Sequence, residues 1–232
     1  MMNQPYKILF NFASRSRPQK CLDAMKTIVD NLANNFDYLI HVAADEDDLS
    51  MKSIFLNLPK SPITNTINHS ITFGVSKNKI DAINRDVNEV SMHFNWDILV
   101  NFSDDMAFTK TGFDNEIREQ FAKHFPDLDG NLHYNDGFTK DKLCTMSIIG
   151  RKYYDRFGYI YHPAYKSLFC DNEYTEVAYT AGKMVYIDEP IFVHNHPANI
   201  GGDADAQLQH TESFFNEDRL TYEKRKENNF KD

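Results

Sequence analysis

Cysteines, glycine-rich loops and long apolar runs are scarce or missing in this 232-residue sequence. Its three cysteines, Cys21, Cys144 and Cys170, are odd in number and lack a C-x-x-C spacing, which argues against a disulfide framework and against a zinc site. No apolar stretch approaches the roughly 20 residues that a membrane-spanning helix needs. The N-terminus also lacks the pattern of a signal peptide. We therefore expect a soluble, cytoplasmic protein with free thiols.

Positive charge is also in short supply. Lysine and arginine together number 25 against 34 acidic residues, which gives a formal charge of −9. Such a surface repels phosphate backbones, so general nucleic-acid binding and nuclease activity are disfavoured. No glycine-rich fingerprint follows the first strand-like segment, which argues against a dinucleotide-binding Rossmann protein and against a P-loop. A local basic pocket remains compatible with this composition.

Apolar and aromatic residues are plentiful by contrast. They include 18 Phe and 12 Tyr, and hydrophobic residues make up 41% of the chain. This composition indicates a packed globular protein, and the length suits one domain with an appendage. We expect the domain to cover residues 1–202, followed by a peripheral C-terminal helix and tail over 203–232.

Four short apolar runs in the first half predict buried strands, at 7–13, 37–44, 68–75 and 97–103. Helical spacing follows the first and third runs, with Ser16 and Ser76 as the expected caps. Strands alternating with helices predict an α/β fold with a mostly parallel sheet. In such sheets, ligands bind at the carboxyl ends of the strands. Four polar loops should meet there, at 14–17, 45–48, 76–79 and 104–105.

The second half has a different pattern. We expect a turn at Asn135–Gly137, a strand from about Leu143, and a helix over 171–181 with Tyr174, Val177, Ala178 and Ala181 inward. One or two strands should follow within 183–197.

Adjacent carboxylates, Asp104 and Asp105, end the fourth strand. Carboxylate oxygens suit Mg²⁺ or Mn²⁺, which also take phosphate oxygens and water as ligands. A capped, solvated turn explains the same residues. His194 and His196 are two positions apart, so on a straight strand they share a face, and an imidazole can complete a Mn²⁺ site. Two surface histidines are the alternative, which weakens if their strand lies against the aspartate strand.

Other candidates are also open to two interpretations. Asp171 begins a predicted helix, where a carboxylate is a common cap, yet it can also act as a general base. Ser14, Arg15 and Arg17 follow the first strand, and Lys79 lies at a helix start; both places suit phosphates but also suit solvated loops. Aromatic side chains near the predicted base can stack on a sugar or simply pack the helix, and they are Tyr159, Tyr161, His162 and Tyr165.

Taken in order, these motifs resemble a glycosyltransferase of the GT-A fold, close to the family 2 type of nucleotide-sugar transferases. The resemblance covers roughly residues 6–200. "ILFNFASRSRP" resembles the first strand and nucleotide loop, "ADEDD" the acidic end of the second strand, and "GVSKNKIDAIN" the segment flanking the nucleotide. "NFSDDM" resembles the DxD metal motif, "FCDNEYTEVA" the acceptor-side motif with the base, and "FVHNHP" the late histidine that binds metal.

The resemblance implies a nucleotide-sugar half over 1–110 and an acceptor half over 111–202. Asp105 with His194 or His196 would hold Mn²⁺ or Mg²⁺, and Asp171 would be the base of an inverting, hexosyltransferase-type reaction. The donor, which we expect to be UDP-linked, would contact the nucleotide-binding candidates Ser14, Arg15, Arg17, Asp45, Lys79 and Asp104.

Two positions depart from the family pattern. Ser103 stands where the strict DxD motif has its first acid, which is why Asp105 is the expected metal ligand. Cys170 replaces the usual acid before Asp171, so Glu173 is the second choice for the base. The acceptor hydroxyl could belong to a glycan, a lipid-linked intermediate, a protein or a modified nucleobase. Two alternatives remain: a non-catalytic binding protein of the same fold, and a nucleotidyltransferase, which the missing glycine-rich loop disfavours.

Overall fold

A seven-stranded sheet forms the centre of the molecule. The computed structural model describes residues 6–33, 37–57, 68–201, 203 and 205–231. All strands of the sheet are parallel except β7, which runs against both neighbours. The order across it is β3 (His69–Gly74), β2 (Tyr38–Asp45), β1 (Ile8–Ala13), β4 (Ile98–Asn101), β7 (Ile148–Gly150), β6 (Asn131–Tyr134) and β8 (Met184–Ile187).

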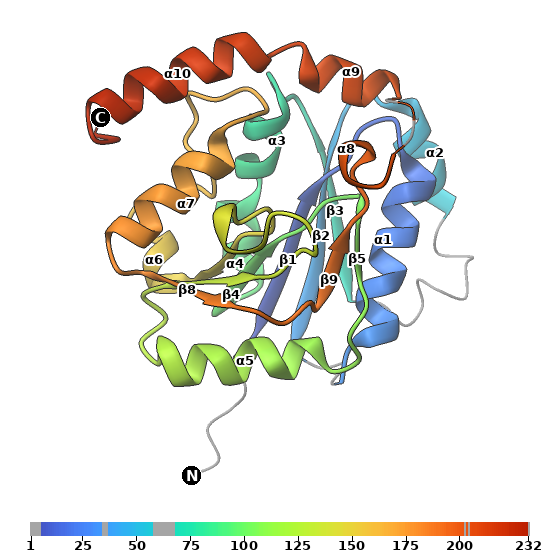
Figure 1. Ribbon diagram of the computed structural model, residues 1–232. Coiled ribbons are helices and arrows are strands. Elements are labelled where there is room, and N and C mark those ends of the chain that lie inside the picture. Colours follow the sequence, from blue (N-terminus) through green and yellow to red (C-terminus); the bar gives the residue numbers. More distant parts are fainter. Residues whose placement is uncertain (1–5, 34–36, 58–67, 202, 204, 232) are drawn as a thin grey trace.

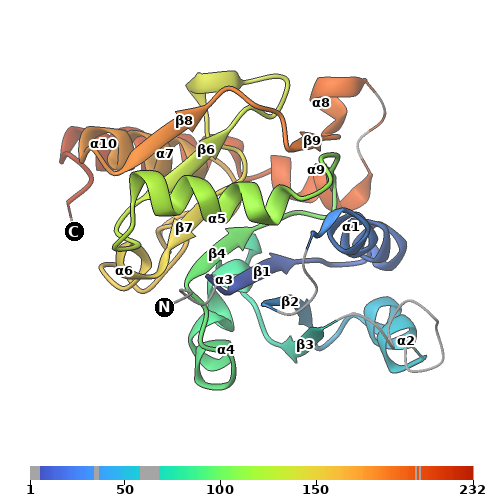
Figure 2. The same cartoon turned by 90° about the horizontal axis from the view of Figure 1, so that it is seen from below.

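Helices cover both faces of this sheet. Alternate residues of β1 divide between the two faces, so that Phe10 belongs to one buried cluster and Leu9 to the other. The first face packs against α1 (Pro18–Asn31), α2 (Leu49–Asn57) and α5 (Phe113–His124). The second packs against α3 (Lys79–Arg85), α4 (Val87–His93), α6 (Arg151–Tyr154) and α7 (Cys170–Thr180). Figure 2 shows α5 and α4 on opposite sides of the sheet.

The predicted α/β architecture with a mostly parallel sheet is confirmed, and the four predicted strands of the first half are present as β1 to β4. In the second half, residues 183–197 contain two strands, β8 and β9 (Phe192–His194). β9 pairs antiparallel with β5 (Met106–Phe108) in a separate two-stranded sheet. This pairing places the end of β9 beside the aspartates that follow β4.

The chain ends in helices that cross the carboxyl-end side of the sheet, as Figure 1 shows. After α8 (Pro197–Ile200) come α9 (Ala206–Glu212) and α10 (Phe215–Glu227). A peripheral helix was expected here. Helix α10 packs against α7, and residues around α9 line a cleft at the carboxyl ends of the parallel strands. No helix of the described ranges has the length and apolar character to cross a bilayer.

Several local expectations were wrong. Ser16 does not cap α1: its backbone N–H donates to Asp48, and Arg17 occupies the cap position without a side-chain bond. Asn78 rather than Ser76 caps α3, because its amide oxygen accepts from the N–H of Asp81 at 2.9 Å.

Two expectations failed in the second half. The strand expected from Leu143 begins only at Ile148, and strand β6 was not predicted. The intervening residues form a loop whose Cys144 N–H donates to the hydroxyl of Thr175 instead of a strand neighbour. Ala181 lies just beyond the end of α7 and is exposed, although it was expected to face inward. The expected turn at 135–137 is present, with Gly137 at a φ of +85°.

Candidate functional site

A cleft of about 480 Å³ lies at the carboxyl ends of the parallel strands. The four loops that the sequence pattern predicts to converge all contribute to its walls. The second half completes it with the predicted His196 and with residues of 167–168 and 207–214, which were not predicted there. The lining includes Ser14, Arg15, Arg17, Asp45, Lys79, Asp104, Asp105 and His196, together with Ser167, Leu168 and six residues between Gln207 and Phe214.

Arg17 and Asp104 form the buried centre of one wall. Asp104 accepts from the hydroxyl of Ser14 at 2.7 Å and from Arg17 Nη1 at 3.1 Å. Burial raises the pKa of Asp104, although these two partners oppose the rise. The other end of the Arg17 guanidinium donates to Asp205, which also accepts from Lys20 at 3.0 Å. A guanidinium shared between two carboxylates at a cleft wall is suited to exchange one of them for a phosphate.

Arg15 occupies the wall above the end of β2. Its Nη1 lies 2.6 Å from carboxylate oxygens of both Asp45 and Asp47, and these hydrogen bonds raise the pKa of the guanidinium. Asp45 also lies 3.7 Å from Arg85, behind the cleft. Two of the predicted nucleotide-binding residues, Arg15 and Asp45, therefore form an ion pair at the wall of the cleft.

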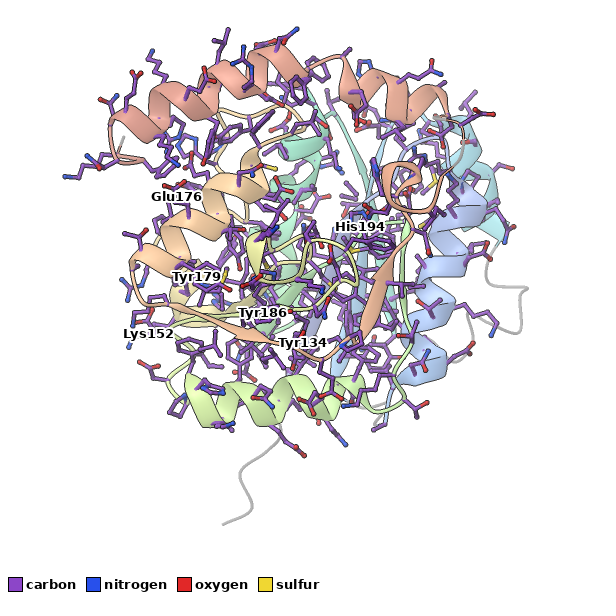
Figure 3. The ribbon with its side chains drawn as sticks, in the orientation of Figure 1. Tyr134, Lys152, Glu176, Tyr179, Tyr186 and His194 are labelled. Carbon is purple, nitrogen blue, oxygen red and sulfur yellow. The ribbon has the colours of Figure 1, made fainter. Side chains whose placement is uncertain are left out.

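The histidine and aspartate motifs meet through the β5–β9 pairing. Met106 lies opposite His194, and the N–H of Asn195 donates to the backbone oxygen of Asp105 at 2.7 Å. His194 Nε2 then lies 3.4 Å from a carboxylate oxygen of Asp105, and the rings of His194 and His196 have centroids 5.7 Å apart. Figure 3 shows His194 at the α8 end of β9. The structure thus brings together the three predicted metal ligands.

These side chains can supply only part of the ligand set of a divalent metal, with a substrate and water supplying the rest. Burial opposes ionisation of Asp105, but the hydrogen bonds from His194 and Ser103 prevail and lower its pKa. Burial lowers the pKa of His196, which favours the neutral imidazole that a metal requires. Within the described residues no three His, Cys, Asp or Glu side chains converge closely enough to enclose an ion by themselves. Phosphate oxygens and water would complete the shell, as is usual for Mg²⁺.

Asp171, the predicted base, lies in the first turn of α7. Phe169 holds the cap position, so Asp171 is not the cap; its Oδ1 accepts from the adjacent N–H of Asn172. Burial raises the pKa of Asp171, and the positive charge of Lys79 opposes that rise. The same lysine charge also lowers the pKa of Asp105. Lys79 is therefore close enough to the predicted base and to the predicted metal ligand for its charge to act on both.

Glu173, the second choice for the base, has a structural role. Its carboxylate accepts from Arg225 at 2.8 and 2.9 Å and from the hydroxyl of Tyr165 at 2.7 Å, and it is buried away from the main cleft. Tyr165 and Tyr161 are themselves core residues, 1% and 5% exposed. Neither can offer a ring face to a sugar in this arrangement.

Tyr159 and His162 line a second cavity of only about 50 Å³, with their rings edge to face at 5.3 Å. These contacts are packing contacts within the aromatic segment of the second half. The four residues predicted on the acceptor side are therefore divided between the core and a small cavity. None of them lines the main cleft, and they are Tyr159, Tyr161, His162 and Tyr165.

Sequence reasoning missed Asp205, Ser167 and Asp218. Asp205 caps α9 and pairs with Arg17 across 188 positions of sequence. The Asp-x-x-Leu pattern before α9 signals only a cap. No local pattern marks Ser167 as a residue of a cleft, or Asp218 as the buried partner of a distant loop.

No family model matches the sequence, and no curated protein matches it. Solved structures do match in fold. A mannosyltransferase from Pyrobaculum calidifontis, in complex with GDP-Man and Mn²⁺, superposes with a TM-score of 0.65 at 10% identity, over 91% of this chain and 70% of that one. TarS 1–349 from S. aureus, in complex with UDP, gives 0.61 at 11% identity, over 90% and 71%.

A third similar structure is a Bacillus anthracis protein described as a glucose-1-phosphate thymidylyltransferase, in complex with a sucrose. Its TM-score is 0.52 at 10% identity, over 88% of this chain and 98% of that one. At such identities the likeness concerns the fold. The chain has the GT-A fold, which was expected from the resemblance of its sequence motifs to those of GT-A glycosyltransferases.

Proposed function

We propose that this chain is a metal-dependent glycosyltransferase that moves a sugar from a nucleoside diphosphate, UDP in the first instance, to an acceptor hydroxyl with inversion. The observation that carries the proposal is that Asp105 and Lys79 line the cleft, that His194 lies 3.4 Å from Asp105, and that the charges of Lys79 and His194 both act on Asp171. These residues come from four separate elements and supply a metal site, a cation and a base. Two similar structures contain GDP-Man with Mn²⁺, and UDP.

Arg15, Arg17 and Lys79 would bind the nucleotide and its diphosphate, with Asp45 at the base or ribose and Asp104 beside them. Asp105 with His194 or His196 would hold Mn²⁺ or Mg²⁺, which when bound neutralises the charge of the departing diphosphate. Asp171 would take the proton of the acceptor hydroxyl. The acceptor oxygen then bonds to the anomeric carbon as the bond to the diphosphate breaks on the opposite face, so one displacement inverts the configuration.

The raised pKa of Asp171 supports this role. A carboxylate whose pKa is raised by burial accepts a proton more readily than a solvated one, provided that it stays ionised at the working pH. Glu173 is the weaker candidate because its lone pairs already accept from Arg225 and Tyr165.

The nucleotidyltransferase alternative is supported by the third similar structure. A transfer assay separates the two. With Mn²⁺ and a panel of nucleotide sugars, a glycosyltransferase releases nucleoside diphosphate, either by transfer or by slow hydrolysis. A nucleotidyltransferase instead releases pyrophosphate from a nucleoside triphosphate and a sugar phosphate. Release of neither product, with nucleotide still bound, would indicate a binding protein of the same fold.

A further inference from the structure

The turn at residues 166–168 forms one edge of the main cleft. Ser167 and Leu168 line the cleft, and Ser167 is only 4% exposed. Among the described residues, the hydroxyl oxygen of Ser167 is buried without a hydrogen-bond partner. Because an unsatisfied buried hydroxyl is costly, such a group at a cleft wall indicates a ligand atom that completes it.

Asp218, on α10, holds this turn in place. Its carboxylate is fully buried and accepts three consecutive backbone N–H groups, from Lys166 at 2.9 Å and from Ser167 and Leu168 at 2.8 Å. Hydrogen bonds to an ionised acceptor are roughly twice as strong as neutral ones. The start of α3 adds a contact, since the N–H of Ile80 donates to the oxygen of Lys166. The turn is therefore fixed by a residue about 50 positions later in the chain.

The same helix fixes the residues that lead to Asp171. Phe169 has a φ of +59°, which is unfavourable for a bulky side chain. Its ring packs against Phe215 and Tyr222, with centroids 5.2 and 5.9 Å away. Tyr222 also donates to Glu176 at 2.7 Å, and Figure 3 shows Glu176 on the side of α7 that faces α10. Helix α10 thus holds the unpartnered serine and the start of α7 as one unit.

We propose that Ser167 binds the sugar of the donor through its hydroxyl, and that Asp218 is the positioning residue that holds Ser167 there. This inference rests on the proposed function. A hydroxyl can donate to and accept from a sugar hydroxyl, whereas the diphosphate is better matched by Arg17, Lys79 and the metal site. Ser167 also precedes Asp171 by only four residues, and the base must face the anomeric carbon of that sugar.

Ser167→Ala tests the contact. We expect the KM for the nucleotide sugar to rise about 3- to 10-fold, the loss of one hydrogen bond. The affinity for the nucleoside diphosphate alone, measured by calorimetry, should stay the same. Ser213→Ala is the matched control, because that hydroxyl donates to the oxygen of His210 in its own helix turn. An equal loss for the sugar-free nucleotide, or an unchanged KM, overturns the assignment to the sugar.

Asp218→Asn tests the positioning role through a double-mutant cycle. If Asp218 acts by holding Ser167, adding Ser167→Ala to Asp218→Asn should raise KM little further. A purely structural aspartate would lower the melting temperature and leave the Ser167→Ala effect intact, which contradicts the proposal. Glu217→Gln, the exposed neighbour that pairs with the Lys166 side chain, serves as control.

Should Asp218→Asn fail to fold, Ser167→Ala alone still decides the contact. If the wild-type protein binds no nucleotide sugar, the proposed function and this inference both fail. If the wild-type protein transfers sugar and Ser167→Ala has the same KM as wild type, only the inference fails.

Discussion

The two halves of the sheet contribute to the site in different ways. In the first half, each parallel strand is followed at once by the side chains that line the cleft, such as Ser14, Asp45 and Asp104. In the second half, Ser167 lines the cleft and Asp171 lies in the first turn of α7, and α10 anchors these segments from outside the sheet through Asp218 and Arg225. The first arrangement depends on strand order alone, whereas the second depends on a helix at the end of the chain.

This difference predicts where substitutions act. Changes in the first half should affect nucleotide and metal binding, and among the first-half residues named as site candidates Lys79 should also affect the base through its charge. Changes in α10 should affect stability and the geometry around α7 together. The predictions below test that division, beginning with the largest effect.

Asp171→Asn should reduce turnover by about 10²- to 10⁴-fold, because the amide cannot take the acceptor proton. Binding of nucleotide and metal should be retained, since the residues proposed to hold them do not include Asp171. Steady-state kinetics and calorimetry check the two parts. Asp155→Asn, in an exposed pair with Arg151, is the control and should be nearly silent. Turnover of Asp171→Asn near that of wild type would remove this residue from the mechanism.

Arg225→Ala should destabilise the fold by about 3–5 kcal/mol, because it leaves the buried Glu173 carboxylate without its cation. For a chain of this size, the melting temperature should fall by roughly 10 °C. Arg219→Ala, which breaks an exposed pair with Glu223 on the same helix, should cost less than about 1 kcal/mol. Equal melting temperatures for the two variants would show that α10 is peripheral after all.

Asp105→Asn should weaken Mn²⁺-dependent nucleotide binding at least about tenfold, since a neutral amide is a poorer ligand for a hard cation. Calorimetric titration of the nucleotide with and without Mn²⁺ measures this loss. Asp203→Asn, which removes an exposed carboxylate, provides the control. An unchanged metal dependence in Asp105→Asn would place the metal elsewhere.

The pH dependence of kcat/KM should reflect Asp171. Burial raises its pKa above the ordinary aspartate value of 3.8, so activity should fall as the pH drops through the raised value and the base becomes protonated. Lys79→Met should move this acid limb to higher pH, because the lysine charge lowers the pKa of Asp171. Lys123→Met on α5 should leave the limb where it is. A shift to lower pH in Lys79→Met would contradict the arrangement.

The smallest effect should come from Asp205→Asn. Under the proposed function, Asp205 would compete with the diphosphate for Arg17. The Asp205 side chain is 39% exposed, so the pair contributes about 0–1 kcal/mol. Removing its charge should strengthen nucleotide binding by up to about fivefold. Weaker binding would show that Asp205 assists the nucleotide rather than competes with it.

The sequence allowed prediction of the first half because its signals are local. Apolar runs ending in polar loops predict parallel strands, and strand order alone brings Arg17, Asp45, Lys79 and Asp105 to one edge. The histidines could be paired with Asp105 only through resemblance, because the β5–β9 contact joins residues about 90 positions apart.

The second half could not be predicted in the same way. Glu173 and Tyr165 are residue types that often occur in active sites. Here they bond to each other, and Glu173 also bonds to Arg225 of α10, so both are buried in the core. Ser167 has no sequence signature, and its position depends on three bonds to Asp218. Long-range pairing of this kind leaves no periodicity that sequence reasoning can use.

The most direct test of the central claim is the thermal stability of the protein with UDP or GDP, each with and without Mn²⁺. Saturation at about 100 times Kd adds roughly 2.7 kcal/mol, a rise of about 5–10 °C in melting temperature. We expect that rise with one nucleotide, only when Mn²⁺ is present, and not in Asp105→Asn. No shift with any nucleotide, or an equal shift without metal, would contradict a metal-dependent nucleotide site at the strand ends.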